Sequence, residues 1–172
     1  MTKKFQWADF YKEFAMRILP YETCRKEMIK QMVDGFKSIG VELPDGEKFE
    51  NLEDIDPFTV IGLCNRSLPD EQRTKIAETV QQIFYVDAFL PTEYDGISTL
   101  DSFFYEGDMA DEEALNNLWE LFHYGLVYDL FQSEDSRINL EKYFNLSKEI
   151  EGMNEEKLKM GLFWILPDMI KE

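Results

Sequence analysis

Hydrophobic residues recur along most of the chain with the spacing of amphipathic helices. Near the N-terminus, apolar residues follow one another at intervals that place them on one face of a helix, and Pro20 ends this run. These residues are Trp7, Phe10, Tyr11, Phe14, Ala15, Ile18 and Leu19. A second run between Cys24 and Ile39 repeats the pattern and ends at Gly40, a residue that accepts the left-handed conformation after a helix. We expect these two helices to pair as a hairpin.

The rest of the chain carries further helix signals. Asp56 and Pro57 suit the start of a short buried helix, because a carboxylate accepts orphan backbone N–H groups and proline has none to leave unpaired. Further amphipathic segments are expected within residues 70–84, 111–126, 138–144 and 154–165. The pattern therefore predicts a mainly α fold of about six or seven helices, in a single domain that spans residues 1–172.

Two segments lack helical periodicity. Residues 41–54 are acidic and contain Pro44-Asp45-Gly46, which is typical of a turn within a loop. Residues 85–110 are interrupted by proline and glycine and are interpreted as a long irregular connection, with a short strand pair around Ile97 or Phe103-Phe104.

The composition is that of a folded protein in a reducing compartment. Apolar residues make up 44% of the 172-residue chain and aromatic residues 15%, enough to fill a core. Only Cys24 and Cys64 are present, so a disulfide-stapled scaffold is not expected. No apolar run has the length of a signal peptide core or a membrane span, and we expect a cytoplasmic protein with no membrane partner.

Charge is distributed unevenly. The net charge is −17, and residues 76–136 hold fourteen acidic side chains and not one lysine or arginine. Such a chain is a poor general binder of nucleic acid or anionic membranes. DNA binding is therefore disfavoured, and any contact with DNA or with a partner's acidic surface would fall to a basic cluster before this acidic half. Its candidates are Asn65, Arg66, Arg73 and Lys75, and the alternative is that these residues pair with neighbouring carboxylates.

Signatures of catalysis are weak. The sequence has no glycine-rich loop ending in Gly-Lys-Ser or Gly-Lys-Thr, and a single histidine, His123, cannot build a triad or a zinc site with two distant cysteines. The acids between Glu106 and Glu113 suit a helix start better than a cation site. A nuclease arrangement of Asp70 with Glu155 and Lys157 has an arbitrary separation. We expect no catalytic, cofactor or metal site in this chain.

Aromatic residues outside the helical stripes are candidates for a cage around a base. They are Tyr94, Phe103, Phe104 and Tyr105, and their acidic surroundings count against DNA.

Several short strings occur in order along nearly the whole chain. They are Phe5-x-Trp7-x-x-Phe10-Tyr11-x-Glu13-Phe14-Ala15, Ile55-Asp56-Pro57-Phe58-Thr59, Gly62-Leu63-Cys64-Asn65-Arg66, Lys75-Ile76-Ala77, Pro91-Thr92 with Asp95-Gly96-Ile97, Leu118-Trp119-Glu120-Leu121-Phe122 and Met160-Gly161-Leu162-Phe163-Trp164-Ile165-x-Pro167-Asp168. Together these strings resemble the N-terminal region of McrB-like AAA+ proteins. Those proteins belong to modification-dependent (5-methylcytosine-specific) restriction systems. In that family a motor domain hydrolyses GTP or ATP, a McrC-like partner carries the nuclease, and the N-terminal domain often recognises modified DNA.

The resemblance implies a non-catalytic recognition or assembly module of a McrB-like restriction ATPase or GTPase. The sequence stops before any nucleotide-binding motif, so we expect either a fragment or a free-standing relative. Its partner would be the motor domain or a McrC-like nuclease subunit. One rival hypothesis is a free-standing acidic interaction domain or DNA-mimic decoy, which needs a continuous exposed band of acids. Another is an enzyme whose acids converge in a pocket with shifted pKa values.

Overall fold

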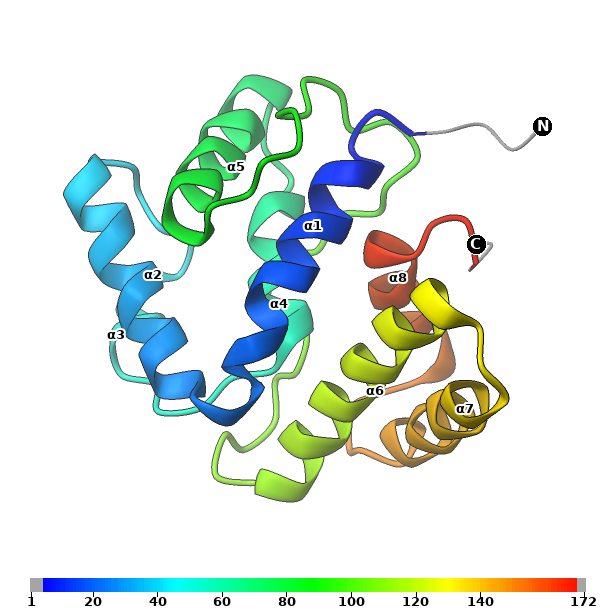
Figure 1. The fold of residues 1–172 in the computed structure, drawn as a ribbon. Coiled ribbons are helices and arrows are strands. Elements are labelled where there is room, and N and C mark those ends of the chain that lie inside the picture. The colour runs from blue at the N-terminus through cyan, green and yellow to red at the C-terminus, as the bar shows by residue number, and fades with distance from the viewer. Residues whose placement is uncertain (1–4, 170–172) are drawn as a thin grey trace.

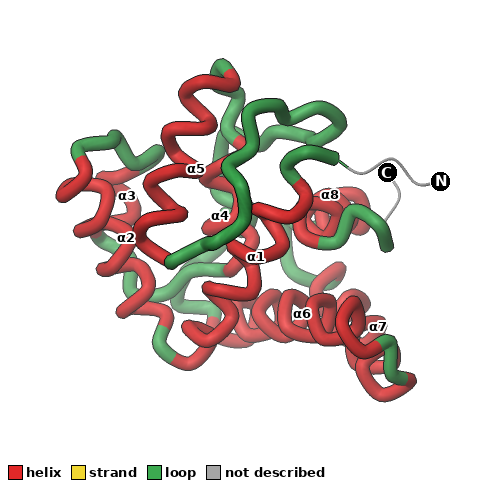
Figure 2. Tube along the Cα trace, turned by 45° about the horizontal axis from the view of Figure 1, so that its top comes forward, coloured by secondary structure: helices red, strands yellow, loops and turns green. Residues whose placement is uncertain are grey.

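Helix α1, Ala8–Ile18, lies at the centre of a helical bundle (Figure 1) and contacts α4, α5 and α8. The computed structural model describes residues 5–169, and within this range it contains helices and loops but no strand (Figure 2). The remaining elements are η1 (Leu19–Thr23), α2 (Arg25–Ile39), α3 (Gly46–Glu50), α4 (Pro57–Ile61), η2 (Gly62–Asn65), α5 (Asp70–Phe84), α6 (Glu112–Phe131), α7 (Glu134–Lys148) and α8 (Glu155–Ile165), where η denotes a 3₁₀-helix. The mainly α prediction is confirmed.

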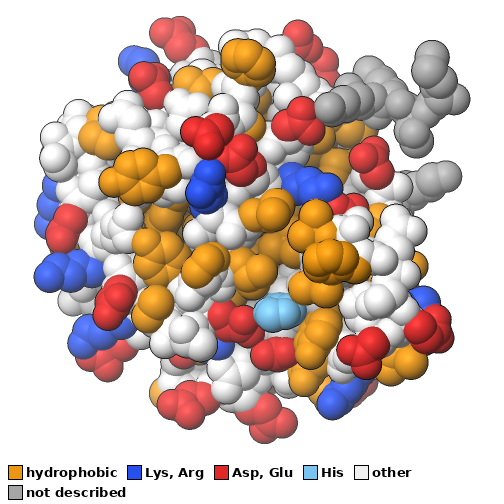
Figure 3. Space-filling view, viewed as in Figure 1, with side chains coloured by type: hydrophobic (Ala, Val, Ile, Leu, Met, Phe, Trp, Pro, Cys, Tyr) orange, Lys and Arg blue, Asp and Glu red, His pale blue; other side chains and the backbone are white. Residues whose placement is uncertain are grey.

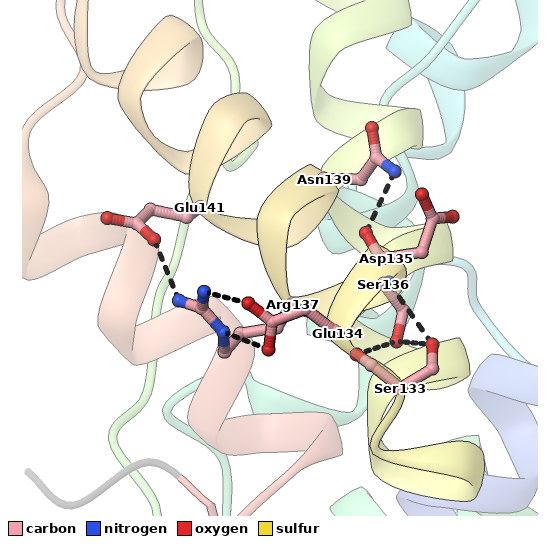
Figure 4. Close-up of polar contacts among 7 residues, drawn as sticks. All are labelled: Ser133, Glu134, Asp135, Ser136, Arg137, Asn139 and Glu141. Carbon is pink, nitrogen blue, oxygen red and sulfur yellow. Dashed lines mark hydrogen bonds and ion pairs between the residues drawn. The ribbon is translucent and has the colours of Figure 1, made fainter.

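The helix boundaries follow the capping chemistry of the sequence. Asp56 accepts a hydrogen bond from the backbone N–H of Thr59 at the start of α4, at 2.9 Å. Asp111, Ser133 and Asn154 cap α6, α7 and α8 in the same way (Figure 4 for Ser133). Gly40 ends α2 in the left-handed conformation, with φ of 85°. These caps satisfy N–H and C=O groups that a helix leaves unpaired at its ends.

The bundle is joined by an aromatic core. Trp7, Trp119 and Trp164 are completely buried, yet each indole N–H donates to a backbone carbonyl outside the helices. The acceptors are Asp95 at 2.8 Å, Ile55 at 2.8 Å and Ser98 at 3.1 Å. Because a buried indole needs an acceptor, the bonds to Asp95 and Ser98 tie the irregular connection to the core, and the bond to Ile55 ties the segment before α4 to it.

Four expectations are wrong in detail. The helices expected to form a hairpin do not pair closely, because α2 packs against α5 and α3. The expected loop at residues 41–54 contains the short helix α3, and no strand pair forms near Ile97 or Phe103 within residues 5–169. The cage candidates are core residues at 5% exposure or less, since the irregular connection folds inward over the helices. These candidates are Tyr94, Phe103, Phe104 and Tyr105.

Because the N-cap residue of α4, Asp56, is buried, the stability of the fold should depend on pH. Asp56 is completely buried, and desolvation raises its pKa from 3.8 to about 6, although hydrogen bonds from Thr59 and from the backbone N–H of Tyr105 oppose the shift. The folded protein therefore binds this proton more tightly than the unfolded chain. Stability from this group should be fully present below the unfolded pKa and should fall as pH rises toward the folded pKa, by roughly 3 kcal/mol in all.

Asp56→Asn should remove this pH dependence, because an amide keeps a cap acceptor and does not titrate. The measurement is the free energy of urea unfolding across the interval between the two pKa values. Asp111→Asn, which changes an exposed cap, is the matched control and should keep the wild-type slope. If the free energy of unfolding of Asp56→Asn changed with pH as steeply as that of the wild type, Asp56 would not be the group responsible for the pH dependence.

Candidate functional site

Two residues of the basic cluster lie inside the protein. Asn65 is completely buried and Arg73 is 5% exposed. The Asn65 Oδ1 accepts from the Tyr11 hydroxyl at 2.7 Å and from Nη2 of Arg73 at 2.8 Å. Nε of Arg73 donates to the Cys64 carbonyl at 3.0 Å, and its guanidinium carbon lies 3.9 Å from the ring centre of Tyr94. The structure thus brings Asn65 and Arg73 together in an interior polar network, not on a surface that meets DNA.

The groups around Arg73 in this network are neutral. Burial raises the pKa of the Cys64 thiol to about 12 and that of Tyr94 to about 12, so both keep their protons at neutral pH. The Arg73 charge is stabilised by carbonyl and amide oxygens and by the face of the Tyr94 ring. A buried charge held in this way fixes the junction of α1, η2 and α5 and has a structural role.

The other two candidates line a cavity. Arg66, at 8% exposure, and the exposed Lys75 border a hollow of about 520 Å³ between the loop before α3 and the first turns of α5. Nη1 of Arg66 pairs with Oδ2 of Asp45 at 2.8 Å. The alternative of pairing with a neighbouring carboxylate therefore describes Arg66. It does not describe Lys75, which has no carboxylate partner within 4.0 Å in the described part of the chain.

A different surface carries exposed aromatic side chains. The segment after α5, residues 85–90, runs alongside α1 (Figures 1 and 2) and exposes Tyr85 at 75% and Phe89 at 97%. Its backbone is fixed, because the Glu13 carboxylate on α1 accepts from the backbone N–H groups of Asp87 and Ala88. We call Tyr85 and Phe89, with this segment, the aromatic loop.

The residues that flank the aromatic loop fix it further. Arg17 of α1 pairs with Asp87 at 3.2 Å. The Gln6 side-chain oxygen accepts from the backbone N–H groups of Thr92 and Glu93, both at 2.7 Å. The two aromatic side chains thus project from a backbone that α1 and its preceding residues hold in place.

Comparison with known protein families identifies the family of this chain. Residues 7–170 match the model of a domain of unknown function, DUF8425. The chain belongs to this family. No curated protein and no solved structure matches the chain.

Two acidic side chains of the DUF8425 domain, Glu22 and Glu120, lie close together where η1 meets α6. Nδ1 of His123 on α6 lies 3.1 Å from Oε2 of Glu22 in η1. Burial and the neighbouring carboxyl of Glu22 raise the pKa of Glu120, which lies one turn before His123. Within residues 5–169, no group of three or more His, Cys, Asp and Glu side chains is arranged to hold a metal ion.

The many acids of the DUF8425 domain are spread over separate elements. On the face shown in Figure 3, acidic side chains lie singly or in small groups around a central band of hydrophobic side chains. Some are neutralised, as Asp87 is by Arg17 and Asp129 by Lys12, and Arg137 joins Glu134 and Glu141 on α7 (Figure 4). This face does not have the continuous acidic band that a DNA mimic needs.

The interior network predicts the effect of one hydroxyl. Tyr11→Phe removes one of the two donors to the buried Asn65 Oδ1 and leaves Arg73 as the other, so we expect a loss of about 1–2 kcal/mol in the free energy of unfolding. Denaturant titration measures it. Tyr85→Phe removes the same hydroxyl at an exposed position and should change stability by less than about 0.5 kcal/mol. Equal effects of the two variants would show that the Tyr11 hydroxyl contributes nothing to stability.

The fixed backbone of the aromatic loop predicts a pattern of hydrogen exchange. Glu13→Ala removes the acceptor for the Asp87 and Ala88 amides, which should then exchange about tenfold faster, as expected for a hydrogen bond of roughly 1.4 kcal/mol. Residue-resolved hydrogen exchange by NMR checks this. Glu27→Ala on the exposed face of α2 should leave both amides unchanged. Unaltered exchange in Glu13→Ala would mean that another contact holds the segment.

Proposed function

We propose that this domain is a non-catalytic recognition or assembly module that docks a protein partner through the aromatic loop. The observation that carries the proposal is Phe89, which is 97% exposed on a backbone fixed by Glu13. Large aromatic side chains dominate the energy of many protein interfaces. A side chain presented from a fixed backbone loses little conformational freedom on binding, so more of its burial contributes to affinity.

The chemistry around the loop favours a partner that is both apolar and basic. Glu93 and Asp95 lie next to the loop, and residues 76–136 contain no lysine or arginine. A nucleic-acid backbone would be repelled by this segment, whereas lysine or arginine side chains around an apolar pocket would complement it. A protein surface of that composition is therefore the occupant that we propose.

The resemblance to McrB-like proteins supplies the context. Most of the residues that carry it lie in the core, for example Phe14, Phe58, Trp119 and Trp164, so it supports a shared fold more than a shared binding surface. We therefore propose that the domain belongs to a cytoplasmic McrB-like restriction ATPase or GTPase and contacts the motor domain or a McrC-like nuclease subunit. Within residues 5–169, no helix is both long and apolar enough to span a membrane.

The test is a calorimetric titration of the purified domain with a McrC-like nuclease subunit. Phe89→Ala should weaken binding by at least about tenfold, because it removes the most exposed anchor, while stability stays within about 0.5 kcal/mol of the wild type. Ile138→Ala is the matched control, since Ile138 is an exposed apolar residue, 53% accessible, on α7. Its affinity should equal that of the wild type.

Two results would contradict the proposal. One is a Phe89→Ala variant that binds the subunit as tightly as the wild type does. The other is binding of the domain to a methylated or unmethylated DNA duplex that weakens steeply between two salt concentrations, which would indicate a phosphate-binding surface instead.

A further inference from the structure

The aromatic loop borders a larger apolar surface that is centred on the outer side of α1. Figure 3 shows a band of hydrophobic side chains that crosses this face from the end of α5 over α1 to α6. Met16 lies on the side of α1 opposite to the buried residues of the helix and is 41% exposed. It follows Glu13, which holds the aromatic loop, by three residues, and Lys12, which pairs with Asp129 of α6, by four. Met16 therefore lies between the loop and α6.

Two ion pairs show how α6 lies beside this part of the chain. Lys12 on α1 pairs with Asp129 near the end of α6. Further along the chain, Glu22 in η1 lies 3.1 Å from Nδ1 of His123, which precedes Asp129 on α6. The segment from α1 to η1 and the second half of α6 therefore lie side by side and run in opposite directions.

α6 contributes apolar side chains on the side that faces η1. Val127 and Leu130 follow His123 at intervals of four and three residues, and side chains at this spacing share one face of a helix. Val127 is half-buried and Leu130 is 52% exposed. We call Met16, Val127 and Leu130, together with the aromatic loop, the docking band.

The docking band lies in negatively charged surroundings. The segments that form it hold six aspartate or glutamate residues and two lysine or arginine residues. These segments are residues 8–23, 85–90 and 120–131. The two cations, Lys12 and Arg17, each pair with a carboxylate, so an excess of negative charge remains. This excess disfavours nucleic acid and a second copy of the chain docked through the same face, and it favours a partner that brings lysine or arginine side chains.

We propose that the docking band binds an amphipathic helix of the partner, whose apolar face is flanked by lysine or arginine side chains. The helix lies along α1, with its apolar side chains on Met16, Leu130 and Phe89. An extended peptide fits less well, because within residues 5–169 there is no strand whose edge could pair with it. α1 has 11 residues, so a helix of about 16 Å, three turns, covers it. This inference rests on the proposed docking through the aromatic loop and specifies the chemistry of the partner.

The experiment is an NMR titration of the full chain with a designed peptide of about 14 residues, four helical turns, with leucine on one face and lysine on the other. We expect a saturable shift of the Met16 methyl resonance. The reference is the methyl resonance of Ile39, which is 39% exposed at the end of α2 and should not shift. Two matched peptides should each bind at least about tenfold more weakly: one has glutamate in place of lysine, and the other has the same composition in an order that gives no apolar face.

Met16→Gln removes the apolar contact at the centre of the docking band and keeps a residue that suits an exposed helix position. Affinity for the leucine–lysine peptide should fall about fivefold, as expected for an apolar side chain that is buried on binding. The backbone amide resonance of Phe89 reports binding in this variant. Ile39→Gln makes the matching change at nearly equal exposure on α2 and should leave the affinity unaltered.

The proposal is overturned if the Met16 methyl does not shift, or if either matched peptide binds as tightly as the leucine–lysine peptide. Its failure differs from failure of the proposed function. If Phe89→Ala weakens binding of the McrC-like subunit but Met16→Gln does not, the partner docks on the aromatic loop alone and the helix proposal is wrong. If Phe89→Ala binds the subunit as the wild type does, the proposed function itself is wrong.

Discussion

The burial of one aromatic helix face is the constraint on which the other elements depend. Phe10, Phe14 and Trp7 are inaccessible to solvent, and helices from the middle and the end of the chain pack around α1. Such a core is non-local, so it forms only when the connection between α5 and α6 also folds inward. The indole N–H of Trp7, bonded to the Asp95 carbonyl, makes this coupling specific. The long connection is therefore part of the core structure even though it has no helix or strand.

Helical periodicity predicted most of the fold because it reports which face of each helix is buried. It located α1 and α5, and the carboxylate and proline at Asp56-Pro57 located the start of α4; both signals depend on neighbours in sequence. Partner choice depends on contacts between distant residues, and for this reason the expected pairing of α1 with α2 was wrong. The cage hypothesis failed for the same reason, since lack of helical period does not distinguish an exposed aromatic side chain from one that the connection buries.

The candidate site was less predictable than the fold. Sequence reasoning grouped Asn65, Arg66, Arg73 and Lys75 by charge, but burial separates them: two complete an interior network and two border a cavity. The sequence around an arginine or lysine does not show whether carbonyl oxygens from other elements surround its side chain in the fold. Phe89 was overlooked, although an aromatic residue two positions before Pro91 in an acidic, non-periodic segment was a signal of the right kind. Its exposure depends on how the connection packs against α1, and this packing is a non-local property.

The same contacts that stabilise the fold thereby prepare its surface. Glu13 lies on α1, whose opposite face is fixed in the core, so the aromatic loop inherits the rigidity of the central helix. A flexible loop with two exposed aromatic side chains would collapse onto nearby apolar surface and lower its own hydrophobic free energy. Here the backbone of Asp87 and Ala88 is held by hydrogen bonds to the Glu13 carboxylate, which opposes such a movement. Exposure of Phe89 is thus maintained by the fold, and a side chain kept in water by structure is available for a partner at small entropic cost.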